Sequence, residues 1–155
     1  MDGAGLGVWE YDVANHRITS PSGSFRKFGV PDTIENVPES ILPRVKEEDR
    51  GRLKEMFRRI EVGEPRVEDY IWMKWREDIP PRCEHVIYSV ERDASGRPSV
   101  AYGIGMDATA QKNAEEQYER ELDELRSTEA VNLIAKGRHN LTQNKVIEYV
   151  PVNQK

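Results

Sequence analysis

The sequence has little of three things, and each shortage excludes a class of protein. A single cysteine, Cys83, rules out an internal disulfide and therefore a disulfide-stabilised scaffold. No apolar run approaches the roughly 18 residues that a membrane-spanning helix needs. The first residues also lack the basic and apolar parts of a secretory signal. We therefore expect a cytoplasmic protein, with no membrane contact within this stretch.

Positive charge is also in short supply. The 155 residues include 23 Lys and Arg against 28 Asp and Glu, which gives a net charge of −5. Because binding to nucleic acid relies on basic side chains that neutralise phosphates, we expect no nucleic-acid partner. Charged residues make up 33% of the chain and hydrophobic ones 37%, which is typical of a globular protein with a large solvent-facing surface.

The first half of the chain predicts a hairpin and one helix. Residues 8–12 and 16–19 are rich in aromatic and β-branched residues and flank a turn at Asn15, a pattern typical of paired strands. Residues 21–43 contain four prolines, which limits them to short helical turns. Residues 47–61 then place apolar side chains three and four positions apart after an acidic first turn, as an amphipathic helix does.

Three further strands are expected at 67–75, 82–90 and 99–106, because these segments are rich in β-forming residues and are separated by short turns. Strands that follow one another in this way pair most simply as an antiparallel meander. The 67–75 segment has large apolar side chains on both faces. This indicates that the outer face of the sheet is covered too, by a second subunit or by the helix that follows.

After residue 108 the character of the chain changes. Residues 111–126 contain no Gly or Pro and are mostly polar, so we expect an exposed helix. Its apolar residues form a narrow seam at intervals of 4, 4 and 3, which suits a partner helix and hence a homodimer. The members of this dimer seam are Ala114, Tyr118, Leu122 and Leu125. We expect Gly137 to end the helix, and residues 146–150 to form a strand of a following, truncated domain.

Several short motifs, taken in order, resemble those of PAS sensory domains of the fold-3 type. Residues 93–96 (Asp-Ala-Ser-Gly) are followed by Gly103 and then by residues 107–109 (Asp-Ala-Thr), which are similar to the Asp-Ile-Thr that ends the family's last strand and begins its exit helix. Residues 45–50 (Val-Lys-Glu-Glu-Asp-Arg) resemble the family's His-Pro-Asp-Asp-Arg helix start. Residues 9–12 (Trp-Glu-Tyr-Asp) resemble its first strand.

The sequence departs from that family at three points. Val45 and Lys46 stand where His-Pro is usual, and Ala108 stands where Ile is usual. Residues 78–81 (Asp-Ile-Pro-Pro) replace the usual Asp-Gly turn between the third and fourth strands. None of these changes removes an expected element, but the altered loop would change the rim of a pocket.

The resemblance implies an α+β fold, with a PAS-like five-stranded antiparallel sheet, short helices on one face and a C-terminal signalling helix. Residues 1–107 would form the sensory domain, 108–136 a helical linker with coiled-coil character and 137–155 the start of the next domain. It further implies a regulatory module of a sensor histidine kinase or a diguanylate cyclase, whose catalytic domain lies outside this chain. Asp107 and Thr109 can both accept hydrogen bonds from the first turn of the helix, so they are the candidates for signal coupling.

A pocket between the helices and the sheet is the main candidate for a binding site. An apolar cavity with a few polar tips suits a small molecule, whose identity the sequence does not reveal. The candidates to line it are apolar and aromatic side chains of the helices and strands: Phe25, Phe28, Met56, Ile60, Tyr70, Trp72, Tyr88 and Tyr102. The alternatives are that these side chains fill the core of a ligand-free dimerisation domain, or that the cleft serves a small enzyme.

No cofactor, metal or catalytic residue has local support in the sequence. Cys83 and His85 lie two positions apart, but a metal site needs two more ligands, so we expect a partly exposed thiol there. The reactive-cysteine motif of flavin-binding PAS relatives is absent, and residues 47–61 contain no histidine for haem, so neither cofactor is expected. His139 follows Gly137 and precedes β-like residues, so we interpret it as a linker residue and not as a phosphoacceptor.

Overall fold

Residues 7–142 are described in the computed structural model of the protein, with side-chain burial described as far as residue 135. The chain divides into two compact units, Met1–Lys112 and Asn113–Lys155. The first unit holds an antiparallel sheet with short helices, and the described part of the second is helical. Within the described residues, no helix combines the length and the apolar character that a membrane crossing requires.

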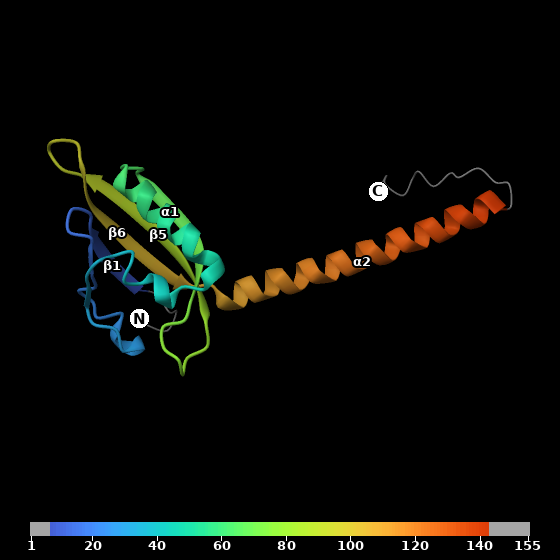
Figure 1. Cartoon of the computed structure of the whole chain (residues 1–155), viewed down its shortest axis with the longest axis horizontal. Helices are drawn as coiled ribbons and strands as arrows, with labels where there is room; N and C mark the ends of the chain where they lie inside the picture. The colour runs from blue at the N-terminus through green and yellow to red at the C-terminus, as the bar shows by residue number, and fades with distance from the viewer. Residues whose placement is uncertain (1–6, 143–155) are drawn as a thin grey trace. The chain divides into compact units, whose positions relative to one another are not determined.

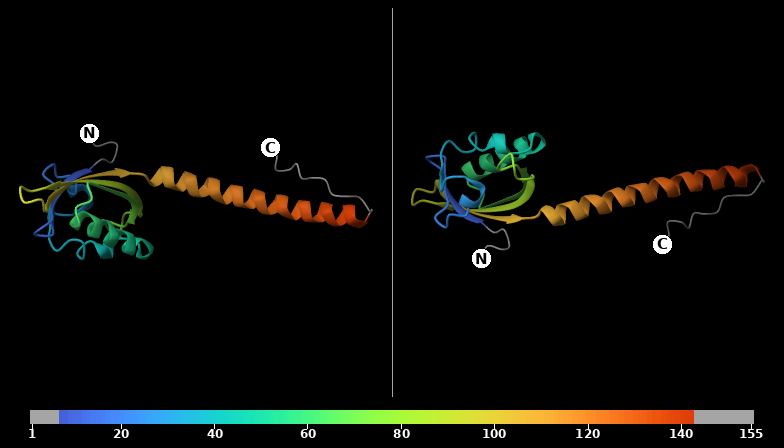
Figure 2. Two further views of the ribbon diagram at one scale, coloured as in Figure 1. Left: turned by 90° about the horizontal axis from the view of Figure 1, so that it is seen from above. Right: turned by 90° about the horizontal axis from the view of Figure 1, so that it is seen from below.

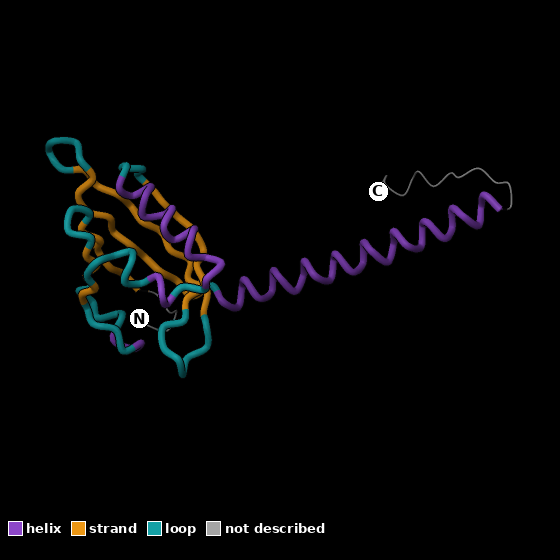
Figure 3. Tube along the Cα trace, in the orientation of Figure 1, coloured by secondary structure: helices purple, strands orange, loops and turns teal. Residues whose placement is uncertain are grey.

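The first unit is built around a six-stranded antiparallel sheet with the order β3-β2-β1-β6-β5-β4 (Figure 1). Its strands are β1 (Gly7–Asp12), β2 (Arg17–Thr19), β3 (Thr33–Ile34), β4 (Arg66–Met73), β5 (Arg82–Arg92) and β6 (Pro98–Asp107). The α+β fold, the β1-β2 hairpin and the β4-β5-β6 meander are confirmed. The loops of the meander lie at opposite ends of its strands (Figure 3).

The sheet has one strand more than the five expected. The additional strand, β3, consists of two residues that pair with β2. Two residues show no alternation of apolar and polar side chains, and β3 lies in the segment that prolines interrupt. Its place in the sheet depends on pairing with a distant strand, which a local pattern does not reveal.

The helices of the first unit cover one face of the sheet, here called the inner face (Figure 2). They are the 3₁₀ turns η1 (Arg26–Phe28), η2 (Leu42–Arg44) and η3 (Glu47–Asp49), and the helix α1 (Arg50–Glu61). The helix predicted at 47–61 is therefore confirmed, with its acidic first turn wound as 3₁₀. The apolar residues of α1 recur at the helical spacing and are buried: Leu53, Met56, Phe57 and Ile60.

The long helix α2 runs over Thr109–Thr142. The prediction that Gly137 ends it is wrong, because α2 continues for five residues beyond this glycine. One glycine costs only about 1 kcal/mol inside a helix, so a single glycine is too weak a signal to end one. The strand expected at 146–150 lies outside the described residues, and so does the side chain of His139.

Candidate functional site

A cavity of about 60 Å³ lies in the first unit, between the inner face of the sheet and the helices. Strands β1, β4, β5 and β6 form one wall, and η1 and α1 contribute to the other. This is several times the space of about 10–15 Å³ that one enclosed water requires. Most of the lining is apolar, and it includes four of the residues predicted for a pocket: Phe25, Phe28, Met56 and Tyr88.

The other four predicted residues do not line this cavity. Ile60 is fully buried on α1, but it belongs to the packed core beside the cavity. The placement of Tyr70, Trp72 and Tyr102 in the pocket is wrong, because side chains alternate along a strand. On β4, Ile71 and Met73 face the cavity, so their neighbours Tyr70 and Trp72 face the other side of the sheet.

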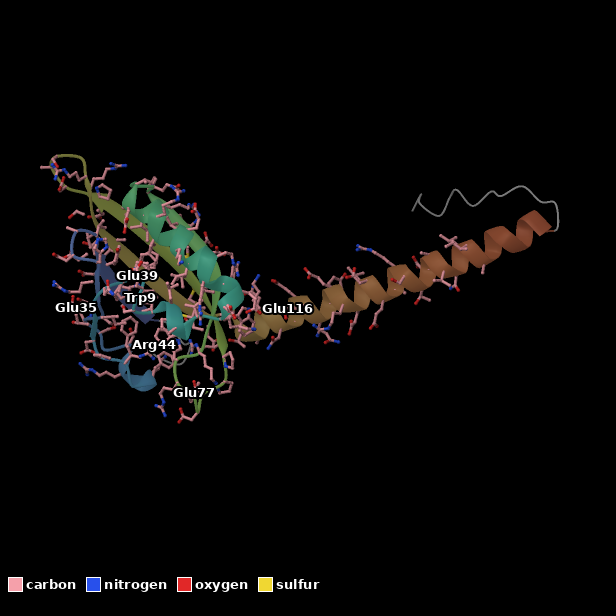
Figure 4. All side chains as sticks on the ribbon, viewed as in Figure 1. Trp9, Glu35, Glu39, Arg44, Glu77 and Glu116 are labelled. Atoms are coloured by element: carbon pink, nitrogen blue, oxygen red, sulfur yellow. The ribbon has the colours of Figure 1, made fainter. Side chains whose placement is uncertain are left out.

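Trp9 belongs to the cavity wall, although the sequence indicated only a strand residue there. Its indole ring lies against β6, where a Cβ atom on Gly103 would come within 2.5 Å of Nε1. A Cβ atom on Gly105 would approach the same ring to 2.6 Å. The two glycines therefore make room for Trp9, whose Nε1 donates a hydrogen bond to the Tyr88 hydroxyl at 2.9 Å. Trp9 is labelled in Figure 4 among the side chains of this unit.

Aromatic rings surround the cavity. Phe28 stacks on Trp75 with 5.0 Å between ring centroids and 10° between ring planes. Phe25 lies between two indoles, 5.7 Å from Trp9 and 6.1 Å from Trp75. Such distances lie in the range over which aromatic pairs attract each other beyond simple area burial. The cavity is therefore bounded by flat, rigid side chains on several sides.

One buried ion pair lies at the wall of the cavity. Arg82 Nε donates to Glu84 Oε2 at 2.6 Å, and Trp75 Nε1 donates to the same oxygen at 3.3 Å. Burial raises the pKa of Glu84 above its ordinary value, although the Arg82 guanidinium and the indole hydrogen bond oppose this. Arg82 also lies over the Phe28 ring, 5.0 Å from its centroid. The carboxylate is thus held in place by groups that themselves line the cavity.

The two signal-coupling candidates, Asp107 and Thr109, lie at the start of α2. Asp107 Oδ1 accepts hydrogen bonds from the Thr109 amide at 3.0 Å and from its hydroxyl at 2.6 Å. Burial disfavours the charged carboxylate, but these hydrogen bonds outweigh it and lower the pKa of Asp107. Asp107 therefore caps the helix as predicted. Thr109 Oγ1 accepts a hydrogen bond from the Cys83 amide of β5 at 2.9 Å, so this side chain links the start of the helix to the sheet.

Cys83 is fully buried, so the expectation of a partly exposed thiol is wrong. Cys83 is covered because the segment that leads into α2 lies against it. The Ala108 amide of that segment donates to the Cys83 carbonyl at 2.8 Å. Burial raises the pKa of the Cys83 thiol to about 11. Two backbone groups of Cys83 thus bind the residues on either side of the point where α2 begins.

A polar and aromatic cluster adjoins this junction on the outer face of the sheet. Tyr70 stacks on His85 with ring centroids 4.2 Å apart, and His85 Nε2 lies 2.6 Å from a carboxylate oxygen of Glu68. Lys112 Nζ lies 4.1 Å from the centroid of the Tyr70 ring. Among the described residues, no group of three His, Cys, Asp or Glu side chains is placed to hold a metal ion.

The predicted dimer seam lies on α2, as the helical spacing requires. Tyr118 is 63% exposed and Leu125 54% exposed, while Leu122 is half-buried. Val131 is also 63% exposed. A seven-residue repeat continued from Leu122 and Leu125 passes through residues 129 and 132, so Val131 lies off the seam.

Several solved structures resemble this chain. One is a sensory-box histidine kinase/response regulator from Burkholderia thailandensis, with a TM-score of 0.65, 18% identity, and coverage of 81% of this chain and 93% of that one. Another is the N-terminal domain of a diguanylate cyclase with a PAS/PAC sensor from Marinobacter aquaeolei. Its TM-score is 0.59 and its identity 18%, and the match covers 69% of this chain and 98% of that one. The PAS domain of the fruit-fly ELK potassium channel has a TM-score of 0.51 and 10% identity, and the match covers 70% of this chain and 90% of that one. The chain has the PAS fold. No protein-family model and no curated protein matches its sequence.

Within this PAS fold, the cavity wall contains three features that the sequence patterns did not predict: Trp9, Trp75 and the Arg82–Glu84 pair. Gly103 and Gly105 were a usable indication of Trp9, because glycines at alternate positions of a strand often mark the close approach of a bulky group. The sequence contained no comparable indication for Glu84. Glutamate is rarely buried, and its neighbours Arg82 and Trp75 become partners only when the loop between β4 and β5 folds.

Proposed function

We propose that this chain is a sensory module of a larger signalling protein, such as a sensor histidine kinase or a diguanylate cyclase. A small molecule binds in the cavity of the PAS fold, and the change passes to α2. In this proposal the chain acts as a regulatory domain in the cytoplasm, with no catalytic role of its own. Two similar structures, one of a sensory-box histidine kinase/response regulator and one of the N-terminal domain of a diguanylate cyclase, support this choice of protein class.

The observation that carries the proposal is the double role of β5. On its inner face, Glu84 and Tyr88 line the cavity. Between Arg82 and Glu84, the backbone of Cys83 binds Ala108 and Thr109 at the start of α2. A ligand that shifts this end of β5 therefore displaces the hydrogen bonds that hold the first turn of the helix. Binding would in this way change the relative populations of two conformations of the protein, which differ in how α2 begins.

We further propose that α2 pairs with α2 of a second copy through the dimer seam. The argument is the spacing and the exposure, since large apolar side chains at coiled-coil intervals are otherwise left in water. A ligand-free dimerisation domain is the competing hypothesis. The cavity favours the sensor, because a purely structural core needs no such space.

Native mass spectrometry of the purified chain tests both parts, because it measures the subunit number and any retained small molecule. We expect a dimer, and we expect Leu125→Asp to shift it strongly towards monomer because a carboxylate cannot be buried in the seam. Val131→Asp is the matched control, since it places the same charge on an exposed apolar position off the seam. A monomer with no adduct at tens of micromolar, or equal effects of the two substitutions, would contradict the proposal.

A further inference from the structure

The cavity carries three indications of its ligand, and this inference rests on the proposed function. The first is the shape of the wall. Six aromatic side chains line a space of about 60 Å³: Trp9, Phe25, Phe28, Phe57, Trp75 and Tyr88. Aromatic faces and edges attract a flat ring more than a branched chain of equal size. Met56 and Met73 also line the space, and their unbranched thioethers repack readily, so that a single ring can enter.

The second indication is charge. The lining contains three charged side chains, Lys27, Arg82 and Glu84. Arg82 and Glu84 neutralise each other, and Lys27 is exposed to solvent. A charged ligand would lose its water shell without gaining an unpaired counter-charge inside the cavity. The site therefore favours a neutral molecule.

The third indication is the hydroxyl proton of Tyr88, which is not donated to any described residue. Tyr88 is 3% exposed, and its hydroxyl oxygen accepts from Trp9 Nε1. A phenol can both accept and donate, but no described residue accepts a hydrogen bond from Tyr88. Burial keeps the pKa of Tyr88 well above its usual value, so the proton stays on the oxygen. Buried donors are almost always paired in native proteins, so this proton is available to an acceptor atom that enters the cavity.

We infer that the cavity binds a small, uncharged, single-ring molecule that accepts a hydrogen bond from the Tyr88 hydroxyl. The ring packs among Trp9, Phe25 and Trp75, and its acceptor atom faces Tyr88. A bound water could use the same proton, and the experiment below separates the two cases.

Four probes of similar size distinguish these features: benzene, pyridine at pH 8, N-methylpyridinium and benzoate. Their affinities for the full chain can be measured by titration in ¹H–¹⁵N NMR spectra, which include the indole N–H signals. We expect the two neutral rings to bind more tightly than either ion. Tyr88→Phe should lower the affinity for pyridine relative to benzene by about two- to tenfold, the range expected for one hydrogen bond.

Two further variants serve as controls. Tyr102→Phe removes a hydroxyl from an exposed residue of the outer face and should leave the ratio of pyridine to benzene affinity unchanged. Trp9→Phe removes the donor to Tyr88 and part of the aromatic wall but leaves the Tyr88 hydroxyl, so it should weaken the binding of both neutral rings while pyridine still binds more tightly than benzene. The affinity of Tyr88→Phe for benzene shows whether that variant keeps its fold and its cavity, because benzene needs no hydrogen bond from Tyr88.

Each outcome has one meaning. If Tyr88→Phe leaves the ratio unchanged, the hydrogen bond from Tyr88 is refuted and a bound water fits instead, while the sensor proposal stands. If N-methylpyridinium or benzoate binds most tightly, the neutral class is refuted, again without affecting the sensor proposal. If no probe binds to the wild-type chain, the ligand-binding cavity itself is refuted, and the proposed function fails with it.

Discussion

The two faces of the sheet differ in the size of the residues that the same strand places on them. On the inner face, β6 has Ala101, Gly103 and Gly105, so that Trp9 can pack against the backbone. On the outer face, the same strand has Tyr102 and Ile104, which are about two-fifths exposed. Small residues therefore line the crowded side, and large apolar residues lie on the open side.

This contrast shows that residue size alone does not tell which side of a strand is buried. The inner face is stabilised by packing and by hydrogen bonds to deeply buried groups, such as the bond from Trp9 to Tyr88, which is 3% exposed. The outer face is stabilised by contacts between half-buried residues that water can still reach, such as Glu68 with His85. Because water competes with contacts of the second kind, equal substitutions on the two faces should have unequal effects.

The largest difference is expected for truncations of apolar side chains. Phe57 is 2% exposed and packs edge-on against Tyr11 and Tyr88, so Phe57→Ala should lower the free energy of unfolding by about 3–5 kcal/mol. Ile104→Ala, at 41% exposure, should cost less than about 1 kcal/mol. Urea unfolding followed by circular dichroism measures both. Equal losses would mean that the outer face is buried in solution.

Phe57→Leu covers the case in which the alanine variant does not fold. It keeps much of the buried volume and should cost less than Phe57→Ala but more than Ile104→Ala.

The next difference concerns two glycines. Gly103→Ala adds a methyl group 2.5 Å from Trp9 Nε1 and 2.9 Å from a Tyr88 ring carbon, so it should destabilise the protein by about 1–3 kcal/mol. Gly51→Ala adds the same methyl group in the first turn of α1, where nothing lies within 4 Å. It should stabilise the protein by about 0.4–1 kcal/mol, since alanine is the better helix former. Thermal unfolding of the two variants would then shift in opposite directions, and a shift in the same direction would contradict the packing of Trp9.

Sequence patterns predicted most of this fold, but only four of the eight pocket candidates line the cavity. The helical spacing in α1 and the β-forming runs in β4, β5 and β6 are local properties, and local properties can be identified in a sequence. The inward side of β4 is not a local property, because Tyr70 and Trp72 are large and carry much apolar surface, as Ile71 and Met73 do. Which pair faces inward depends on the register with β5 and on α1, so the four candidates could not be separated beforehand.

The junction before α2 shows the same limit. The capping role of Asp107 follows from residues two positions apart, and it was predicted correctly. The bond from the Cys83 amide to Thr109 joins residues 26 positions apart, and no local pattern contains it. For the same reason the burial of Cys83 was missed, since the residues that cover it follow a strand that begins fifteen positions later in the chain.

The smallest effect is a pair of opposite pH dependences from one carboxylate on each face. Burial raises the pKa of Glu84 above its ordinary value of 4.5, so its contribution to stability is full below pH 4.5 and is lost as the pH rises through the raised pKa. The hydrogen bond with His85 lowers the pKa of Glu68, so its contribution is present above pH 4.5 and is lost as the pH falls through the lowered pKa. Urea unfolding of the wild type, Glu84→Gln and Glu68→Gln between about pH 3.5 and 7 tests this. The advantage of the wild type over Glu84→Gln should shrink with rising pH and that over Glu68→Gln with falling pH, whereas parallel trends would show that the two faces do not differ in how they hold charge.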